Sequence, residues 1–86
     1  MANAKPSNPA TRQPAPYMLI DPDNGDRIIS RHRMLSAAAR ALRRYNRAFK
    51  RRNGAYAYNN VTLVHADGGP LTVTERSQFA AEVFAA

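Results

Sequence analysis

Residues 33–52 read RMLSAAARALRRYNRAFKRR, and this stretch decides the fold class. Its apolar residues recur at spacings of three and four, which is the period of one face of an α-helix. They are Leu35, Ala38, Leu42, Tyr45 and Phe49. The other alanines in the stretch favour a helix by intrinsic propensity. The sequence therefore predicts a helix from Arg33 to Arg52. Ser30 is its expected N-cap, and Gly54 is expected to end it.

The opposite face of this predicted helix is basic. At about 100° per residue, the arginines that point away from the apolar stripe are Arg40, Arg44, Arg47 and Arg51. Arg33 joins this row, and Arg43 and Lys50 flank it. An ordinary solvated helix face places acids among its bases, because opposite charges at i,i+4 are stabilising. A row of like charges therefore favours an anionic partner over a merely solvated face.

The charge of the whole chain is concentrated around this helix. The protein has 86 residues, with 13 Lys or Arg, 6 Asp or Glu, and a net charge of +7. Residues 27–66 contain no acid and ten of the cations, nine of which are Arg, whose planar guanidinium suits phosphate and carboxylate. The predicted nucleic-acid-binding residues are Arg27, Arg31, Arg33, Arg40, Arg43, Arg44, Arg47, Lys50, Arg51 and Arg52.

A β-hairpin is predicted before the helix, over residues 17–30. Asn24-Gly25 stands between two apolar runs, which is a strong hairpin signal. The same turn superficially resembles a calcium-binding loop, but the position of the bidentate Glu is occupied by His32, and a hairpin turn explains every residue type. No metal site is predicted.

A second hairpin is predicted after the helix. Val61 to His65 reads as a strand, a turn follows at residues 67–69, and Leu71 to Thr74 reads as the partner strand. Thr74 is the expected cap of a short C-terminal helix. The predicted fold is therefore α+β in the order ββαββα. A small antiparallel sheet of two hairpins packs against one long basic amphipathic helix, with a short C-terminal helix.

Residues 1–16 read MANAKPSNPATRQPAP and contain four of the six prolines. Such a stretch buries too little apolar surface to offset the entropy of ordering it. The sequence predicts a disordered Pro-rich tail over residues 1–16 and a single small α+β domain over residues 17–86. No secretory signal and no membrane span are predicted. The absence of cysteine suits a reducing cytoplasm.

The aromatic and histidine residues outside the helix carry weaker signals. Tyr56 and Tyr58 follow Arg51 and Arg52, and aromatic rings among cations can stack on unpaired bases. The interpretation that both rings pack over the helix end or attach the linker to the sheet is favoured, because few aromatic residues are available for a core. The two histidines lack the nucleophile and orienting group of a hydrolytic site, and no nucleotide-binding loop is present, so neither an enzyme nor a cofactor is predicted.

The favoured function is nucleic-acid binding, to DNA or RNA, through the Arg-rich helix face. The alternative is a protein-binding regulator or inhibitor that docks on an acidic protein surface. A short Ala- and Arg-rich chain with a Pro-rich start is similar to small accessory proteins of phages and plasmids. Membrane binding is not favoured, because the apolar stripe is needed to cover the sheet.

The tail assignment can be tested by truncation. Deletion of residues 1–15 should leave the thermal midpoint almost unchanged, because little buried surface is lost. Circular dichroism melts of both chains measure this. A drop of many degrees in the shortened chain would show that the tail packs on the domain.

Overall fold

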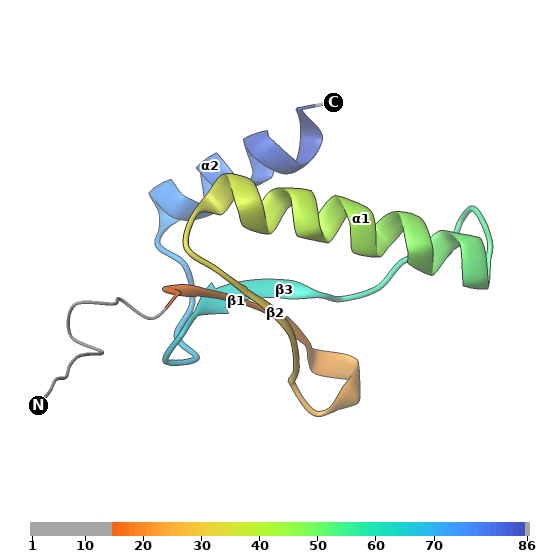
Figure 1. Cartoon of the computed structure of the whole chain (residues 1–86), viewed down its shortest axis with the longest axis horizontal. Helices are drawn as coiled ribbons and strands as arrows, with labels where there is room; N and C mark the ends of the chain where they lie inside the picture. The colour runs from red at the N-terminus through yellow and green to blue at the C-terminus, as the bar shows by residue number, and fades with distance from the viewer. Residues whose placement is uncertain (1–14, 86) are drawn as a thin grey trace, which may run out of the picture.

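The computed structural model describes residues 15–85 and shows an α+β fold (Figure 1). Its elements in chain order are β1 (Tyr17–Asp21), the short 3-10 helix η2 (Pro22–Asn24), β2 (Arg27–His32), α1 (Leu35–Asn53), β3 (Thr62–His65) and α2 (Val73–Phe84). The α+β class and the antiparallel sheet are confirmed. The order of strands and helices is ββαβα, so the predicted order ββαββα is wrong.

The sheet has three antiparallel strands in the order β2-β1-β3, with β1 in the centre. Tyr17 lies opposite His32, and Asp21 lies opposite Arg27, with a register shift between Leu19 and Ile20. The first predicted hairpin is therefore present. Its turn needs a positive φ, and Gly25 supplies one at 68°.

The predicted second hairpin is wrong. β3 pairs with β1, and the chain after β3 meets it only at one bridge, between Val64 and Pro70. Pro70 has no N–H to give to a ladder. The Thr72 hydroxyl then accepts a hydrogen bond from the Glu75 N–H, and the Glu75 carboxylate accepts one from the Thr72 N–H. This capping box starts α2 at Val73, so residues 71–74 form no strand and the cap is Thr72, not Thr74.

The predicted start of the long helix is also wrong by two residues. Ser30 is not its N-cap, because it lies in β2 opposite Leu19 and sheet pairing continues to His32. α1 begins at Leu35 after Met34, which makes no side-chain capping bond. It ends at Asn53, one residue beyond the predicted Arg52. Gly54 follows as expected, with φ at 109°, and its N–H donates to the Lys50 carbonyl at 2.8 Å.

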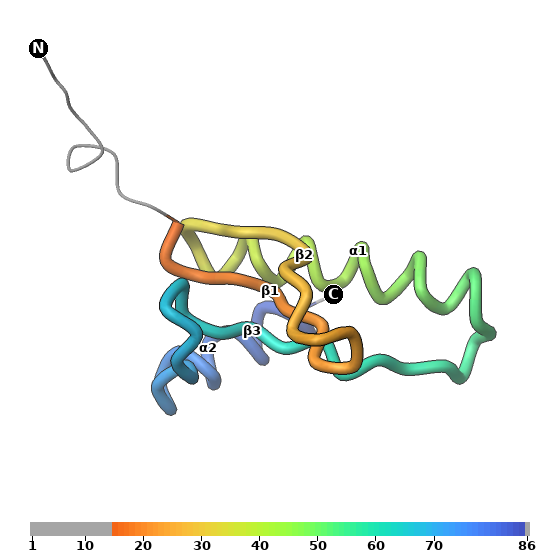
Figure 2. Tube along the Cα trace, turned by 90° about the horizontal axis from the view of Figure 1, so that it is seen from below, coloured from red at the N-terminus to blue at the C-terminus, as the bar shows by residue number. Residues whose placement is uncertain are grey.

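Both helices cover the same face of the sheet. Figures 1 and 2 together show α1 running over β1 and β2, while α2 lies toward β3. The core consists of buried aliphatic residues from β1, β3, α1 and the segment before α2: Leu19, Ala38, Leu42, Leu63 and Leu71. Ala38 and Ala39 are fully buried, so the small side chains of α1 let its backbone approach its neighbours closely.

A polar cluster fixes α2 to the sheet. The Tyr17 hydroxyl donates to Glu75 Oε2 at 2.9 Å, and His65 Nε2 lies 2.7 Å from Glu75 Oε1. The pKa of Glu75 is lowered to about 2, first by the backbone hydrogen bond from Thr72 and then by the side chains of Tyr17 and His65, against the effect of burial. The carboxylate therefore stays ionised at neutral pH and joins β1, β3 and α2.

Leu42 provides a test of this packing. It is 9% exposed at mid-helix, so Leu42→Ala should reduce the free energy of unfolding by about 2–5 kcal/mol through lost contacts and a cavity. Urea titration followed by circular dichroism measures the loss. Gln78→Ala, at an exposed position of α2, is the control and should change it by less than about 0.5 kcal/mol. An unchanged urea midpoint for Leu42→Ala would contradict the packing described here.

Candidate nucleic-acid interface

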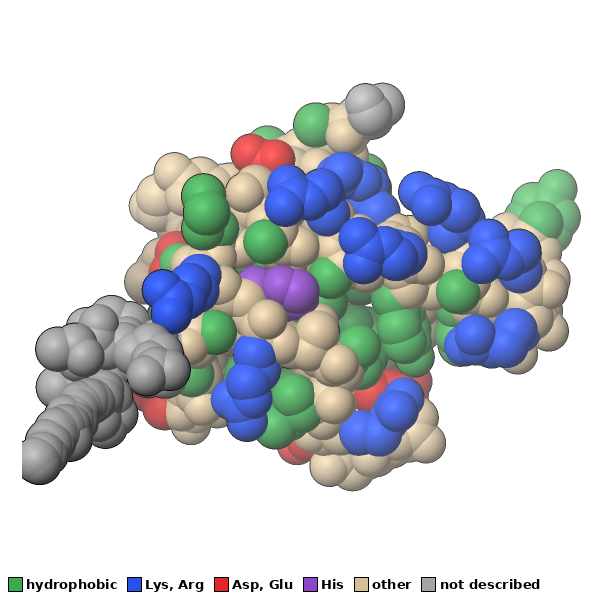
Figure 3. Space-filling model, viewed as in Figure 1, with side chains coloured by type: hydrophobic (Ala, Val, Ile, Leu, Met, Phe, Trp, Pro, Cys, Tyr) green, Lys and Arg blue, Asp and Glu red, His purple; other side chains and the backbone are tan. Residues whose placement is uncertain are grey.

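Nine of the ten cations predicted to bind nucleic acid are exposed in the structure. They are Arg27, Arg31, Arg33, Arg40, Arg44, Arg47, Lys50, Arg51 and Arg52. Figure 3 shows Lys and Arg side chains along the length of α1 and again over the β1–β2 hairpin, with hydrophobic side chains between the two groups. We call this surface, formed by α1 and β2, the basic face.

Arg43 differs from the other nine. Its side chain is only partly exposed, and its guanidinium donates a hydrogen bond to the carbonyl of Glu82 in the last turn of α2. A cation is favourable there, because the carbonyl end of a helix carries partial negative charge. The structure thus gives Arg43 a contact that joins the two helices. Phosphate binding by Arg43 stays a prediction.

The arginines of α1 have few negative partners within the protein. Among residues 15–85, Arg40, Arg44, Arg47 and Arg51 form no ion pair. On β2, Arg27 lies 3.8 Å from the buried carboxylate of Asp21. The row on α1 therefore presents its charge to solvent without internal neutralisation.

His32 lies at the end of β2, within the basic face. Its Nε2 is 2.7 Å from the Ser30 hydroxyl, and its side chain is partly buried. Burial lowers the pKa of His32, and the positive charges of Arg40 and Arg44 lower it further. The imidazole is therefore mainly neutral at pH 7, because burial and the two neighbouring arginines disfavour its protonated form.

An apolar depression lies between α1 and β2. It has a volume of about 300 Å³ and is lined by Ile29, Ser30, Ala41, Arg44, Tyr45 and Ala48. The Tyr45 ring is stacked on Phe49, with ring centroids 6.4 Å apart and an angle of 22° between the planes. We call this depression the α1–β2 hollow. It places apolar surface directly beside the arginine row.

Tyr56 and Tyr58 lie in the connection between α1 and β3 and are 99% and 81% exposed. The expectation that both rings pack over the helix end or attach the linker to the sheet is wrong, because both residues are largely exposed. The connection is held instead by polar groups, since Asn59 donates to Asn46 Oδ1 of α1 at 2.9 Å. Base stacking by the two tyrosines stays a prediction.

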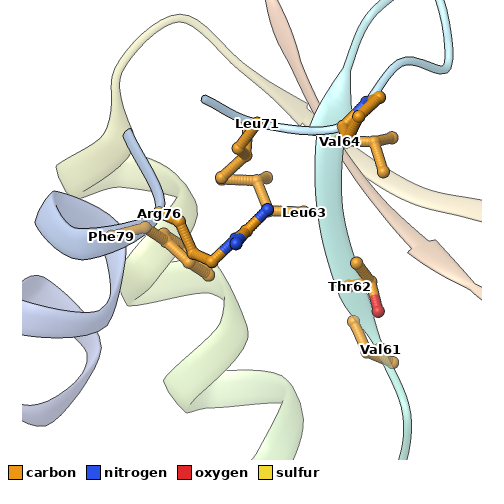
Figure 4. Close-up of a pocket in the computed structure, with 8 residues that line it drawn as sticks. Val61, Thr62, Leu63, Val64, Leu71, Arg76 and Phe79 are labelled. Carbon is orange, nitrogen blue, oxygen red and sulfur yellow. The ribbon is translucent and has the colours of Figure 1, made fainter. Parts of the chain in front are cut away.

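A second hollow lies at the opposite edge of the sheet, outside the basic face. Its volume is about 310 Å³, and its lining comes from Val61, β3, the segment that follows β3, and α2. Figure 4 shows Arg76 extending from α2 toward Leu63 above this hollow. The Thr62 hydroxyl beside it donates to the Asn60 carbonyl at 2.8 Å, so it is engaged locally. The arrangement contains one cation and no acid.

Two aspartates of the first hairpin are engaged within the protein. Asp21 accepts a hydrogen bond from Asn24 at 2.6 Å, and Asp23 accepts one from Asn60 at 3.1 Å. Within residues 15–85, no group of three or more His, Cys, Asp or Glu side chains lies close enough to hold a metal ion. Neither α1 nor α2 is long and apolar enough to cross a membrane.

Comparison with known protein families, with curated proteins and with solved structures gives no match to this chain.

Sequence reasoning missed the hollow and the place of His32 beside the arginines. Tyr45 was assigned to the core stripe, yet its side chain also lines the hollow. One local signal was available for His32: residues two apart in a strand share a face, so Ser30 and His32 had to lie together. Ala41 and Ala48 lie near Ile29 because of the way α1 crosses the sheet, and no short sequence pattern predicts that crossing.

The electrostatics of His32 give a test that does not depend on any ligand. Replacing both neighbouring arginines, Arg40→Gln with Arg44→Gln, should raise the pKa of His32 toward its ordinary value without reaching it, because burial remains. An NMR titration of the His32 ring protons measures this. Arg52→Gln is the control, because Arg52 lies about 12 Å further along the helix than Arg44.

The sign of the pH effect on stability follows from the same shift. The folded state disfavours the protonated imidazole, so stability should fall as the pH drops from about 6.5 through the lowered folded-state pKa.

In the NMR titration, a pKa of His32 that stays the same in the Arg40→Gln, Arg44→Gln variant would show that the two arginines do not face His32.

Proposed function

We propose that the protein binds nucleic acid through the basic face, without catalysis. The observation that carries the proposal is the row of exposed arginines on α1 that form no ion pair among residues 15–85. Like charges at i,i+3 and i,i+4 destabilise a helix, by a few tenths of a kcal/mol per pair. A polyanion removes that cost when it binds.

The dimensions of the row fit a phosphate backbone. From Arg40 to Arg51 the helix rises about 16 Å, over which one strand of B-DNA presents about five phosphates. Arginine pairs with phosphate through parallel N–H donors, and each neutralised phosphate releases counterions. Affinity should therefore be steeply salt-dependent and nearly independent of base sequence.

The rest of the chain is compatible with such a role. The lack of cysteine suits the reducing cytoplasm, where nucleic acids are accessible. The small size and basic composition are similar to accessory proteins of phages and plasmids. In the alternative role, the basic face docks on an acidic protein, and that outcome is distinguished by the salt dependence below.

Charge reversal on α1 tests the proposal. The double variant Arg44→Glu with Arg47→Glu should abolish binding, while the thermal midpoint holds or rises slightly because like-charge repulsion is relieved. Fluorescence anisotropy with a labelled oligonucleotide at several salt concentrations measures binding. For the unchanged protein, five phosphate contacts give a slope of log affinity against log salt of about −4 to −5 on duplex and about −3 to −4 on a single strand.

A matched pair of single variants separates location from net charge. Arg44→Glu lies on the basic face, and Arg76→Glu lies on α2 outside it, yet each lowers the net charge equally. Only Arg44→Glu should weaken binding strongly. Absence of binding at about 50 mM salt, or full binding by the double variant, would refute the proposal. A shallow salt slope with weak binding would favour the acidic protein partner.

A further inference from the structure

The α1–β2 hollow does not fit the phosphate backbone that the arginine row fits. Its lining is mostly aliphatic or aromatic, with Ile29, Ala41 and Ala48 around the Tyr45 ring. A phosphate placed on such a surface would lose water without gaining hydrogen bonds. A group that matches this lining is apolar, and anionic groups beside it would match Arg44.

One cation lines the hollow, and a second lies on the same side of the sheet. Arg44 lines it from α1. On β1, Leu19 and Asp21 share one face, because alternate residues of a strand point the same way and the extra residue of the register shift, Ile29, lies on β2. Their partners on β2, Ser30 and Arg27, therefore share that face as well, and it is the face that α1 covers. Arg27 thus lies on the same side of the sheet as the hollow.

We propose that the ligand is a single strand of nucleic acid, with one unpaired base in the α1–β2 hollow against Tyr45 and its flanking phosphates on Arg44 and Arg27. This inference rests on the proposed function and specifies its ligand. A nucleobase is the flat apolar group that a polyanion carries between its charges. Stacking on an aromatic side chain is the usual way in which single strands are held without sequence preference.

The geometry of Tyr45 supports this assignment. Its ring lies beside the Phe49 ring, which limits the directions in which it can turn, so a base that packs against Tyr45 meets a partly preorganised surface. A volume of about 300 Å³ is at the small end of the range for ligand pockets, which suits one base better than a larger group. In a duplex the bases are already stacked and paired, so a duplex contacts the arginine row and leaves the hollow empty.

The test compares three labelled ligands of twelve nucleotides at one salt concentration: single-stranded oligo-dT, the same backbone without bases, and a duplex. We expect oligo-dT to bind about tenfold more tightly than the base-free strand, in line with one stacked base. Tyr45→Leu should remove this difference and leave the affinity for the base-free strand unchanged. Phe79→Leu, an equivalent change in the hollow at the other sheet edge, is the control and should preserve the difference.

A second variant covers the case in which Tyr45→Leu unfolds. Ala48→Leu fills the hollow from α1 without removing a core side chain, and it should also abolish the preference for bases. Thermal melts establish that each variant is folded.

The outcomes separate this inference from the proposed function. If none of the three ligands binds, the proposed function fails. If all three bind equally and neither variant changes this, the proposed function stands and the single-strand inference is overturned. Tighter binding of a twelve-residue poly-glutamate than of any nucleic acid overturns the inference in favour of an acidic protein partner.

Discussion

Burial of Leu19 in the central strand is the constraint on which the rest of the structure depends. It is the largest side chain in residues 15–85 that is fully buried, and it lies opposite Leu63 of β3 under Leu42 of α1. β1 has a hydrogen-bonded strand on each side, and these strands do not cover its faces. Its apolar face is covered by the helices. α1 must therefore turn its apolar stripe inward, and the period of the helix then directs Arg40, Arg44 and Arg47 outward. The position of the charge thus follows from the packing of the core.

Because the core is small, the same residues of α1 contribute both to the packing of the fold and to the surface beside the arginines. Few large apolar side chains are available, and Tyr45 both packs on Phe49 and lines the α1–β2 hollow. Small alanines allow close packing of α1 where Ala38 and Ala39 are buried. The same residue type at Ala41 and Ala48 leaves space against β2. One helix composition therefore yields a tight layer on one side and an open depression on the other.

Much of the architecture was readable from local sequence signals. The spacing of Leu35, Leu42 and Phe49 predicts α1, and Asn24-Gly25 predicts the first hairpin. The second hairpin was predicted wrongly because strand pattern was favoured over a cap signal that was also present. Thr72 and Glu75 stand three residues apart, which is the spacing of a capping box, and Pro70 before them cannot donate to a sheet.

The candidate site was predictable only in part. The positions of the exposed cations of α1 can be predicted from the helical period, because that period alone separates its apolar face from its exposed face. Pairing of β3 with β1 joins residues more than forty positions apart, and the contact between Arg43 and Glu82 is similarly distant. Such contacts depend on how the layers stack, and a local pattern does not contain that. The α1–β2 hollow belongs to the same class.

The two ends of α1 differ in how firmly they are held. Its first half packs against the sheet and α2, whereas residues 50–53 are exposed and are followed by residues 54–56, which are exposed as well. There, cations at the carbonyl end and the Gly54 bond to Lys50 replace tertiary packing. Amide hydrogens should therefore exchange fastest in the last turn and slowest near Ala38. α1 thus combines a first half that packs into the domain with an exposed last turn that local hydrogen bonds hold, so a partner that binds the last turn would have to order it.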